Sequence, residues 1–369
     1  MTEREQQILT LLRQDPLIPQ QQLADQLGIS RSAVAGHIMN LMQKGHILGK
    51  GYILSGQRHV VVLGGANMDI RGATRQALRF GDSNPGAVSC SPGGVGRNIA
   101  ENLARLGEDC RLISCVGDDI HGRSLLDITQ RAGVDVRPCL VLPDAATSTY
   151  LSIHGPDGDM AIAINDMAIL ERLGPAQLAE QRELVRHAAL IVADANLSAD
   201  ALAWLFAEAG DTPVFVDTVS AFKAQRLRPW LGKIHTLKPN RIEATQLSGL
   251  PLESAADIPA VMHWFHAQGV QQLVLSMADE GIHFSTAAGV RGRLPAPLVD
   301  IVNATGAGDA LMAGLAHGWL ADMPLADAVR FAQGCAALTL QYAGTTCPTL
   351  SGSAVQHFLT ATSSSQETA

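Results

Sequence analysis

A glycine-rich segment, 303–310, carries the residues best suited to chemistry. It reads Asn-Ala-Thr-Gly-Ala-Gly-Asp-Ala and is followed by an apolar run, Leu311 to Leu320, that predicts a helix. Small residues at a helix N-terminus let several backbone N–H groups face one point, which favours a phosphate there. Asp309 would lie beside that point, where it could take a proton from a hydroxyl that attacks phosphorus. The alternative is a glycine-rich helix start with a capping acid.

A second glycine-rich segment, 92–98, also precedes a helical pattern. It reads Pro-Gly-Gly-Val-Gly-Arg-Asn. Gly93 and Gly94 would let the backbone approach a ligand closely, and the Asn98 amide offers both a donor and an acceptor. These residues predict part of a binding site, with a plain turn at the start of a helix as the alternative.

Asn67 and Asp69 follow the first apolar run of the large domain, His59 to Gly64. Such a run predicts a buried parallel strand, and open α/β sheets bind ligands at the carboxyl ends of their strands. Because side chains alternate along an extended segment, Asn67 and Asp69 would share one face. They could then grip neighbouring hydroxyls of a sugar, with a polar turn as the alternative.

Asn240 and Glu243 are separated by one helical turn. At that spacing the two side chains share a face, and their oxygens could order Mg²⁺ through water. A pair that only caps a helix is the alternative interpretation.

The elements that must position these residues alternate between strand and helix. Further strands are predicted at 111–115, 190–193, 214–216, 236–237 and 273–275, with helices at 97–106 and 122–132 between them. This alternation predicts an α/β domain with a doubly wound sheet. Two stretches, 71–91 and 138–163, break the pattern and predict inserted strands that form a small β lid over the site.

Residues 1–56 are predicted to form a separate module, with the α/β domain at 57–369. The module carries five Lys or Arg and four Asp or Glu, a net charge of +1. Because the whole chain has a net charge of −8, the rest of the chain carries −9. Its helical patterns up to Lys44, followed by two short strands at 47–54, are typical of a winged helix-turn-helix. Arg31 and Ser32 would face the major groove of DNA and Lys50 a phosphate. A module that binds no DNA is the alternative.

Composition excludes several classes of protein. The 369 residues are 47% hydrophobic and 17% charged, which allows a sizeable core and argues against disorder. Aromatic residues make up only 4%, so stacking surfaces for RNA are not expected. The six cysteines form no C-x-x-C pair, the first residues are charged, and no long apolar run occurs. We therefore expect a cytoplasmic protein with no membrane partner.

Together these segments resemble, in order and spacing, the two signatures of the ribokinase, or PfkB, family of carbohydrate kinases over residues 58–350. The resemblance implies a ribokinase-like fold and a kinase that uses ATP and Mg²⁺. It implies an anion hole and a catalytic base formed by Gly306, Ala307, Gly308 and Asp309. It places the sugar against Asn67, Asp69, Gly93, Gly94 and Asn98. It places the nucleotide and water-bound Mg²⁺ against Asn240, Glu243, Ser276, Gly281, Thr305 and Gln333.

Four segments, 82–86, 92–100, 163–167 and 235–241, further resemble the bacterial pseudouridine kinases within that family. This resemblance implies ATP-dependent phosphorylation of the 5′-hydroxyl of pseudouridine. It places Asn165 and Asp166 on the lid, near the base of the nucleoside.

Two positions depart from the family pattern. Val95 stands where ribokinases usually have Lys, which disfavours ribose as the substrate. Asn303 stands where many members have an Asp that acts on a monovalent cation. Asn303 can offer a carbonyl oxygen to K⁺ but no charge, so a K⁺ requirement is only weakly expected. A kinase for another nucleoside such as inosine, a sugar kinase, and a transcriptional regulator that senses a nucleoside all stay open. We expect a homodimer in each case.

Overall fold

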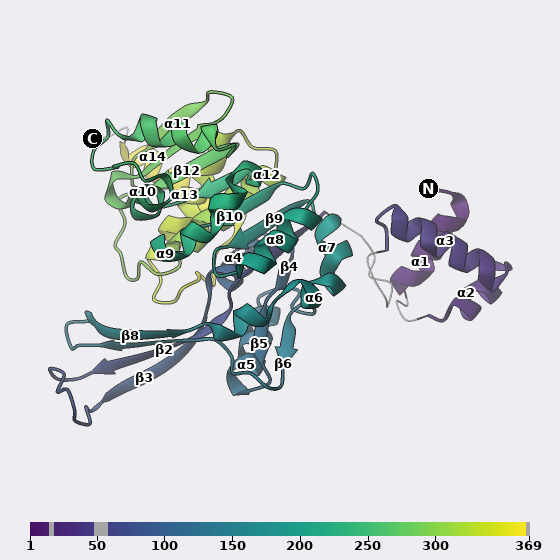
Figure 1. Cartoon of the computed structure of the whole chain (residues 1–369), viewed down its shortest axis with the longest axis horizontal. Coiled ribbons are helices and arrows are strands. Elements are labelled where there is room, and N and C mark those ends of the chain that lie inside the picture. Colours follow the sequence, from purple (N-terminus) through teal and green to yellow (C-terminus); the bar gives the residue numbers. More distant parts are fainter. Residues whose placement is uncertain (15–17, 48–57, 367–369) are drawn as a thin grey trace.

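The computed structural model describes residues 1–14, 18–47 and 58–366. Its central sheet has eight strands in the order β14-β13-β12-β11-β10-β9-β1-β4 (Figure 1). Six of them run parallel: β1 His59–Leu63, β4 Asp109–Ile113, β9 Leu190–Asp194, β10 Val214–Asp217, β11 Thr236–Lys238 and β12 Gln272–Ser276. Two antiparallel strands, β13 Ile282–Thr286 and β14 Arg291–Leu294, complete one edge. The predicted doubly wound sheet is confirmed, although β4 begins two residues earlier than expected.

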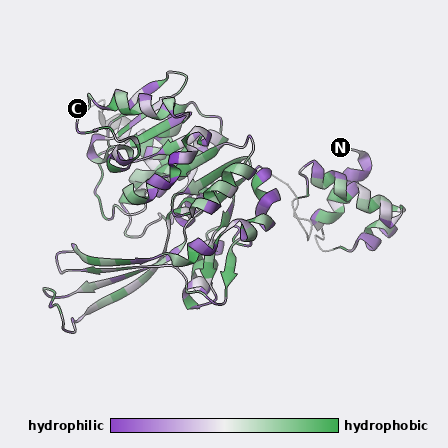
Figure 2. Ribbon diagram, viewed as in Figure 1, coloured by the Kyte–Doolittle hydropathy of each residue, from purple (hydrophilic) through white to green (hydrophobic). Residues whose placement is uncertain are grey.

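Helices cover both faces of the sheet because the strands are apolar on both sides. Along β1, Val60 and Val62 face the core that includes Ile99 and Leu311, whereas Val61 and Leu63 face the core that includes Leu205. Hydrophobic residues, coloured green, make up most of the central strands (Figure 2). The first core contains α4 Val95–Arg105, α12 Ala307–Leu320 and α13 Leu325–Leu340, and the second contains α8 Ala199–Glu208, α10 Arg241–Ser248 and α11 Ile258–Ala267. This burial holds the strand ends, and the residues on them, in fixed positions.

The remaining helical elements of the α/β domain lie around this framework. They are α5 Ile120–Arg131, α6 Pro175–Leu178, α7 Arg182–Arg186, α9 Ala221–Ala224 and α14 Gly352–Gln366, with 3-10 turns at Ala168–Arg172, Ala179–Gln181, Gln225–Lys233 and Ala278–Glu280. Among the described residues, no helix combines the length and the apolar character needed to cross a bilayer.

A four-stranded sheet projects from the main domain (Figure 1). Its order is β3-β2-β7-β8, formed by β2 Asn67–Thr74, β3 Gly86–Gly93, β7 Thr149–His154 and β8 Met160–Asp166. A further pair, β5 Cys115–Gly117 and β6 Leu140–Leu142, forms its own sheet, in which Cys115 packs in a core of the main domain and Val116 packs with Met68 of β2. The predicted inserted strands are confirmed. Because β2 begins at Asn67, the base of the projecting sheet lies beside the end of β1.

The amino-terminal module is a three-helix unit with its own apolar core. Its helices are α1 Glu3–Gln14, α2 Gln20–Leu27 and α3 Arg31–Gln43. Gly28 ends α2 in the left-handed conformation, with φ of 63°, and Ser30 caps α3 by accepting a hydrogen bond from the Ala33 N–H. The predicted hairpin at 47–54, apart from Ile47, and the predicted boundary between residues 56 and 57 fall outside the described residues.

Candidate active site

Charged side chains gather where three neighbouring strands of the main sheet end. Asp194 closes β9, Asp217 closes β10 and Lys238 closes β11, and all three are buried. Lys238 Nζ lies 2.9 Å from Asp217 Oδ2. Asp194 accepts a hydrogen bond of 2.8 Å from the Gly65 N–H, in the loop between β1 and β2. The carboxyl edge of the sheet is therefore the polar centre of the domain.

The glycine-rich segment before α12 opens onto this same centre. Gly306 caps the helix with φ of 87°, and a side chain there would collide with the Thr345 carbonyl oxygen. A Cβ atom on Gly308 would lie 3.4 Å from Lys238 Nζ, so the first turn of α12 faces that ammonium group. The free N–H groups of a helix N-terminus and a nearby lysine make this a place for a phosphate.

Asp309 lies in the first turn of α12 and is 8% exposed. Its Oδ2 accepts a hydrogen bond of 2.7 Å from Asn98 Nδ2 on α4. Burial, together with the nearby carboxylate of Asp217, raises the pKa of Asp309 to about 8, although the bond from Asn98 acts in the opposite direction. A carboxylate with a pKa close to neutrality is suited to accept a proton.

The residues predicted to bind a sugar are close together, at the base of the lid. Asn67 Nδ2 donates a hydrogen bond of 2.6 Å to Asp69 Oδ1. A side chain on Gly93 would collide with the Asp69 carboxylate, and one on Gly94 would collide with the backbone of the loop before β2. Asn98 donates its backbone N–H to the Gly94 carbonyl and its side-chain NH₂ to Asp309, so this group and Asp309 lie in one site.

Asn240 and Glu243 form the helix cap that was the alternative interpretation. Asn240 Oδ1 accepts a bond of 2.9 Å from the Glu243 N–H, and Glu243 Oε2 accepts one of 2.9 Å from the Asn240 N–H. Glu243 Oε2 also accepts a bond of 2.5 Å from the Thr218 hydroxyl. This arrangement fixes both oxygen-bearing side chains beside Lys238, and oxygen atoms are the ligands that Mg²⁺ prefers, usually with several waters retained. Within the described ranges, no cluster of three or more His, Cys, Asp or Glu is arranged to bind a metal by itself.

The residues predicted to contact the nucleotide form three groups. Ser276 lies at the end of β12 and bridges to Asn240. Gly281 packs against the backbone at 294–296, and Gln333 donates a bond of 2.7 Å to the Pro295 carbonyl in the same segment. Thr305 donates its N–H to Asn303 Oδ1 at 3.0 Å. Asn303 also donates to the Ala343 carbonyl at 2.9 Å, so its side chain ties two loops together.

Asn165 and Asp166 lie on opposite faces of the lid sheet. Asn165 lies opposite Tyr150, which lies opposite Asp69, so these three residues share one face of the sheet. Asp166 lies in the next row, with Thr149 and Met68, on the other face. Its carboxylate accepts a bond of 3.2 Å from the Ala168 N–H. Both residues lie on the lid as expected, but only Asn165 shares the face of Asp69.

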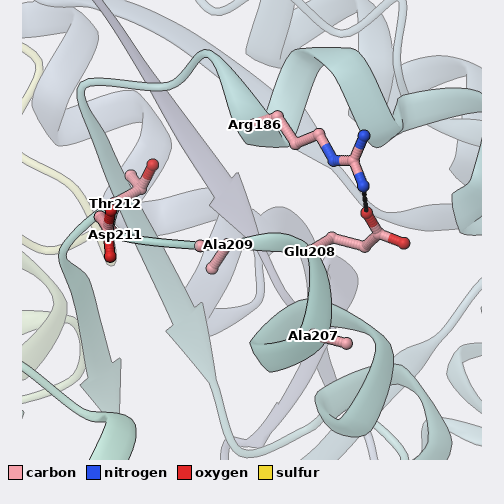
Figure 3. Close-up of a pocket in the computed structure, with 7 residues that line it drawn as sticks. Arg186, Ala207, Glu208, Ala209, Asp211 and Thr212 are labelled. Atoms are coloured by element: carbon pink, nitrogen blue, oxygen red, sulfur yellow. Dashed lines mark ion pairs between the residues drawn. The ribbon is translucent and has the colours of Figure 1, made fainter.

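A broad hollow elsewhere in the domain is not part of this site. It lies between α7, α8 and the turn before β10, and contains the ion pair between Arg186 and Glu208, whose Nη2 and Oε2 are 2.8 Å apart (Figure 3). Because it adjoins the amino end of β10, it lies at the edge of the sheet opposite Asp309.

Sequence reasoning missed several residues of the site. Asp194, Asp217 and Lys238 each end a buried strand, and the rule that ligands bind at carboxyl ends could have found them. Tyr150 needed the strand register, because only pairing with Asp69 places it on the polar face of the lid.

Two family models and several known proteins resemble the chain. The model of the pfkB family carbohydrate kinases matches residues 57–351, and a model of winged helix-turn-helix DNA-binding domains matches residues 1–47. An uncharacterised sugar kinase of Escherichia coli K12, YeiI, is 48% identical over 351 residues, which cover 95% of this chain and 97% of that protein. The pseudouridine kinase of the same strain is 47% identical over 293 residues, which cover 79% of this chain and 94% of that protein.

The fold also matches solved structures. A structure of Arabidopsis thaliana ribokinase in complex with ribose and ATP superposes with a TM-score of 0.74 at 22% identity, covering 82% of this chain and 98% of that one. The predicted ribokinase-like fold is confirmed.

Proposed function

Because the chain belongs to the pfkB family of carbohydrate kinases, we propose that it transfers the γ-phosphoryl group of ATP to the 5′-hydroxyl of a nucleoside, and that this nucleoside is pseudouridine. The observation that carries the reaction type is the buried Asp309 at the start of α12, bonded to Asn98 and facing the same centre as Lys238. The choice of nucleoside is supported by 47% identity to the E. coli pseudouridine kinase.

Asp309 is the proposed general base. The 5′-oxygen attacks the γ-phosphorus, the bond from phosphorus to the bridging oxygen breaks, ADP leaves, and the hydroxyl proton passes to Asp309. The backbone N–H groups of Gly306, Ala307 and Gly308 would stabilise the transferred phosphoryl oxygens. Lys238, directed at Gly308, would add a positive charge.

The substrate and cofactor assignments follow the two sides of the site. Asn67, Asp69, Gly93 and Gly94 would hold the ribose, and Asn165 on the same lid face would contact the base. ATP would lie against Ser276, Gly281, Thr305 and Gln333. Asn240 and Glu243 would hold Mg²⁺ through water, and the ion would neutralise phosphate charge. K⁺ is not part of the proposal, because the Asn303 amide is engaged by two loops.

A panel of nucleosides and sugars with ATP tests the proposed substrate. Pseudouridine is expected among the best substrates by kcat/KM. Inosine or a free sugar as the preferred acceptor would keep the reaction class and reject the named nucleoside. The chain is 48% identical to an uncharacterised sugar kinase and 47% identical to a pseudouridine kinase, so the substrate panel decides between a sugar and pseudouridine.

We also propose that the amino-terminal module binds DNA, and that the chain acts as a nucleoside-responsive regulator as well as a kinase. The proposal is supported by the helix-turn-helix match and by the exposure of Arg31 and Ser32 at the start of α3. Lys44 is bound to Glu5, with Nζ 2.8 Å from Oε1, so it does not add to a phosphate-binding surface. Lys50, the proposed phosphate contact, lies outside the described residues. Salt-dependent binding to DNA that flanks the gene tests the proposal.

The expected homodimer is proposed to form through the lid. One face of the lid carries apolar residues that are largely exposed, among them Val88, Ile162 and Ile164 at 74%, 53% and 60%. An exposed apolar sheet face of this kind is suited to cover a second copy of itself. The proposal places the dimer in the cytoplasm.

A further inference from the structure

Arg97 is the largest fully buried side chain of the molecule's described part, and no role in the reaction has been given to it so far. It lies in the first turn of α4, where the charges of both Asp69 and Asp309 act on it. A buried guanidinium is costly unless it is paired and hydrogen-bonded. Its Nε nevertheless lacks a partner within the described residues, so its two terminal nitrogens must provide the compensation.

The two terminal nitrogens of Arg97 connect an acid to an amide. One donates a hydrogen bond of 2.5 Å to Glu101 Oε2, and the other donates one of 2.5 Å to Asn98 Oδ1. Glu101 is in turn bound by Arg105 and by the Thr346 hydroxyl, so it does not depend on Arg97 for its position. The contact specific to Arg97 is therefore the one with Asn98.

That contact decides which way the Asn98 amide points. A guanidinium can only donate hydrogen bonds, so the end of the amide that meets it must be the carbonyl oxygen. The NH₂ end then faces Asp309, where it donates the bond of 2.7 Å. The Thr345 hydroxyl lies 3.3 Å from Asn98 Oδ1 and can donate to it, but a hydroxyl can also accept, so the orientation is set by Arg97.

We propose that Arg97 is a positioning residue for phosphoryl transfer: it fixes the Asn98 amide so that its NH₂ group holds the Asp309 carboxylate toward the acceptor hydroxyl. This inference rests on the proposed function. Without Arg97 the amide can turn its oxygen toward Asp309, which repels the carboxylate and favours the protonated acid. The base is then misplaced and more often occupied by a proton.

Other charged groups also act on Asp309 and stay in place when Arg97 is replaced. Asp217 on β10 and Asp194 on β9 favour the protonated acid, and Lys238 on β11 favours the carboxylate. The effect of Arg97 must therefore appear as a change added to this background, and the test is designed to isolate it.

The test compares Arg97→Met with Asn98→Ala, with the double variant, and with Arg111→Met as the matched control. Arg111 is also a buried arginine paired with an acid, Asp109, but it lies within β4, away from the carboxyl edge. Arg97→Met is expected to lower kcat about ten- to a hundredfold, the scale of a misplaced reacting group, with little change in KM. The double variant should be no slower than Asn98→Ala, because Arg97 acts through Asn98. Arg111→Met should keep the wild-type kcat.

The pH profile supplies a readout that loss of packing does not move. The acid limb of kcat/KM should shift to higher pH in Arg97→Met and stay unchanged in Arg111→Met. If Arg97→Met unfolds, Arg97→Lys replaces it. Lysine keeps the ion pair with Glu101 but lacks the second guanidinium nitrogen that bonds to Asn98. A folded Arg97 variant with wild-type kcat and pH limb overturns the proposal, and so do effects of Arg97→Met and Asn98→Ala that multiply.

A measurement without turnover separates this inference from the proposed function. If the wild type phosphorylates no nucleoside, the proposed function fails, but the link between Arg97 and Asp309 can still be followed by thermal unfolding against pH. Stability should fall over a wider alkaline range in Arg97→Met than in the wild type. The difference should vanish when both proteins also carry Asp309→Asn. A difference that persists in the Asp309→Asn background overturns the inference alone.

Discussion

Lys238 and Asp217 form a buried ion pair, with Nζ 2.9 Å from Oδ2, directly opposite the first turn of α12. Burial acts to lower the pKa of Lys238, but the attraction of Asp217 outweighs it and keeps the ammonium group charged. The contact is an ion pair by distance, yet Asp217 Oδ2 lacks a well-aligned hydrogen bond among the described residues. Asp217 therefore stabilises the charge on Lys238 mainly by electrostatic attraction.

Lys238→Met is therefore expected to lower kcat by about a hundredfold, the scale of losing one charge-stabilising donor at a reacting oxygen, with little change in nucleoside affinity. It should also destabilise the protein by about 3–5 kcal/mol, because Asp217 is left as an unpaired buried charge. Steady-state kinetics and denaturant unfolding check the two effects.

The matched control is Lys233→Met. Lys233 is an exposed lysine that precedes β11, at the opposite edge of the sheet from Lys238. Its ammonium group donates a hydrogen bond to the Phe206 carbonyl. It should leave kcat unchanged. A folded Lys238→Met protein with wild-type kcat would remove Lys238 from the mechanism.

The lid register predicts different outcomes for two neighbouring residues. Asn165 shares a sheet face with Asp69, whereas Asp166 points to the other face. Asn165→Ala is expected to reduce the preference for pseudouridine over other nucleosides about tenfold, the scale of one hydrogen bond. Asp166→Ala should leave that preference unchanged. The ratio of kcat/KM values for pseudouridine and uridine measures both, and equal effects of the two variants would contradict the assignment of faces.

The ionisation of Asp309 should make the protein less stable as pH rises. Its pKa is raised from 3.8 to about 8 in the folded state, so the folded protein binds a proton that the unfolded chain has released. Stability attributable to this residue is therefore lost progressively between about pH 4 and pH 8. Asp309→Asn should remove this dependence and raise the melting temperature at pH 8 by a few degrees. Thermal unfolding between pH 5 and pH 9 checks the sign, and a lower melting temperature for Asp309→Asn at pH 8 would contradict it.

The apolar face of the lid predicts a dimer that one charge disrupts. Ile164 is 60% exposed in the single chain, and Ile164→Glu places a carboxylate on that face. We expect the variant to sediment as a monomer at concentrations at which the wild type is a dimer. Ala163→Glu, on the opposite face in the row of Ser152, is the control and should stay dimeric. A wild-type protein that is already monomeric would reject the proposed interface.

Much of the architecture could be predicted because it depends on local pattern. Apolar runs such as His59 to Gly64 identified the buried strands, and the glycine-rich segment before Leu311 identified the helix start that faces the site. The broken alternation after residue 70 identified the lid. Each of these signals is contained in a few consecutive residues.

The contacts that complete the site could not be predicted in the same way. Asn98 and Asp309 are 211 residues apart, and they meet only because α4 packs against α12. Nothing local distinguishes Asn165 from Asp166, because the side of the lid that each faces depends on pairing with Tyr150 and Thr149. Asn240 and Glu243 had two readings, and only the three-dimensional structure showed that they cap α10.

The central claim is that Asp309 is the base of an ATP-dependent nucleoside kinase. The most direct measurement is ADP release with ATP, Mg²⁺ and pseudouridine, with the product identified by mass and by the site of phosphorylation, for the wild type and for Asp309→Asn. We predict pseudouridine 5′-phosphate from the wild type, and a kcat lower by a hundredfold or more for Asp309→Asn, on the order of the loss of a general base, with nucleoside binding retained. Near-wild-type turnover by a folded Asp309→Asn protein, or no phosphorylation of any nucleoside by the wild type, would contradict the account.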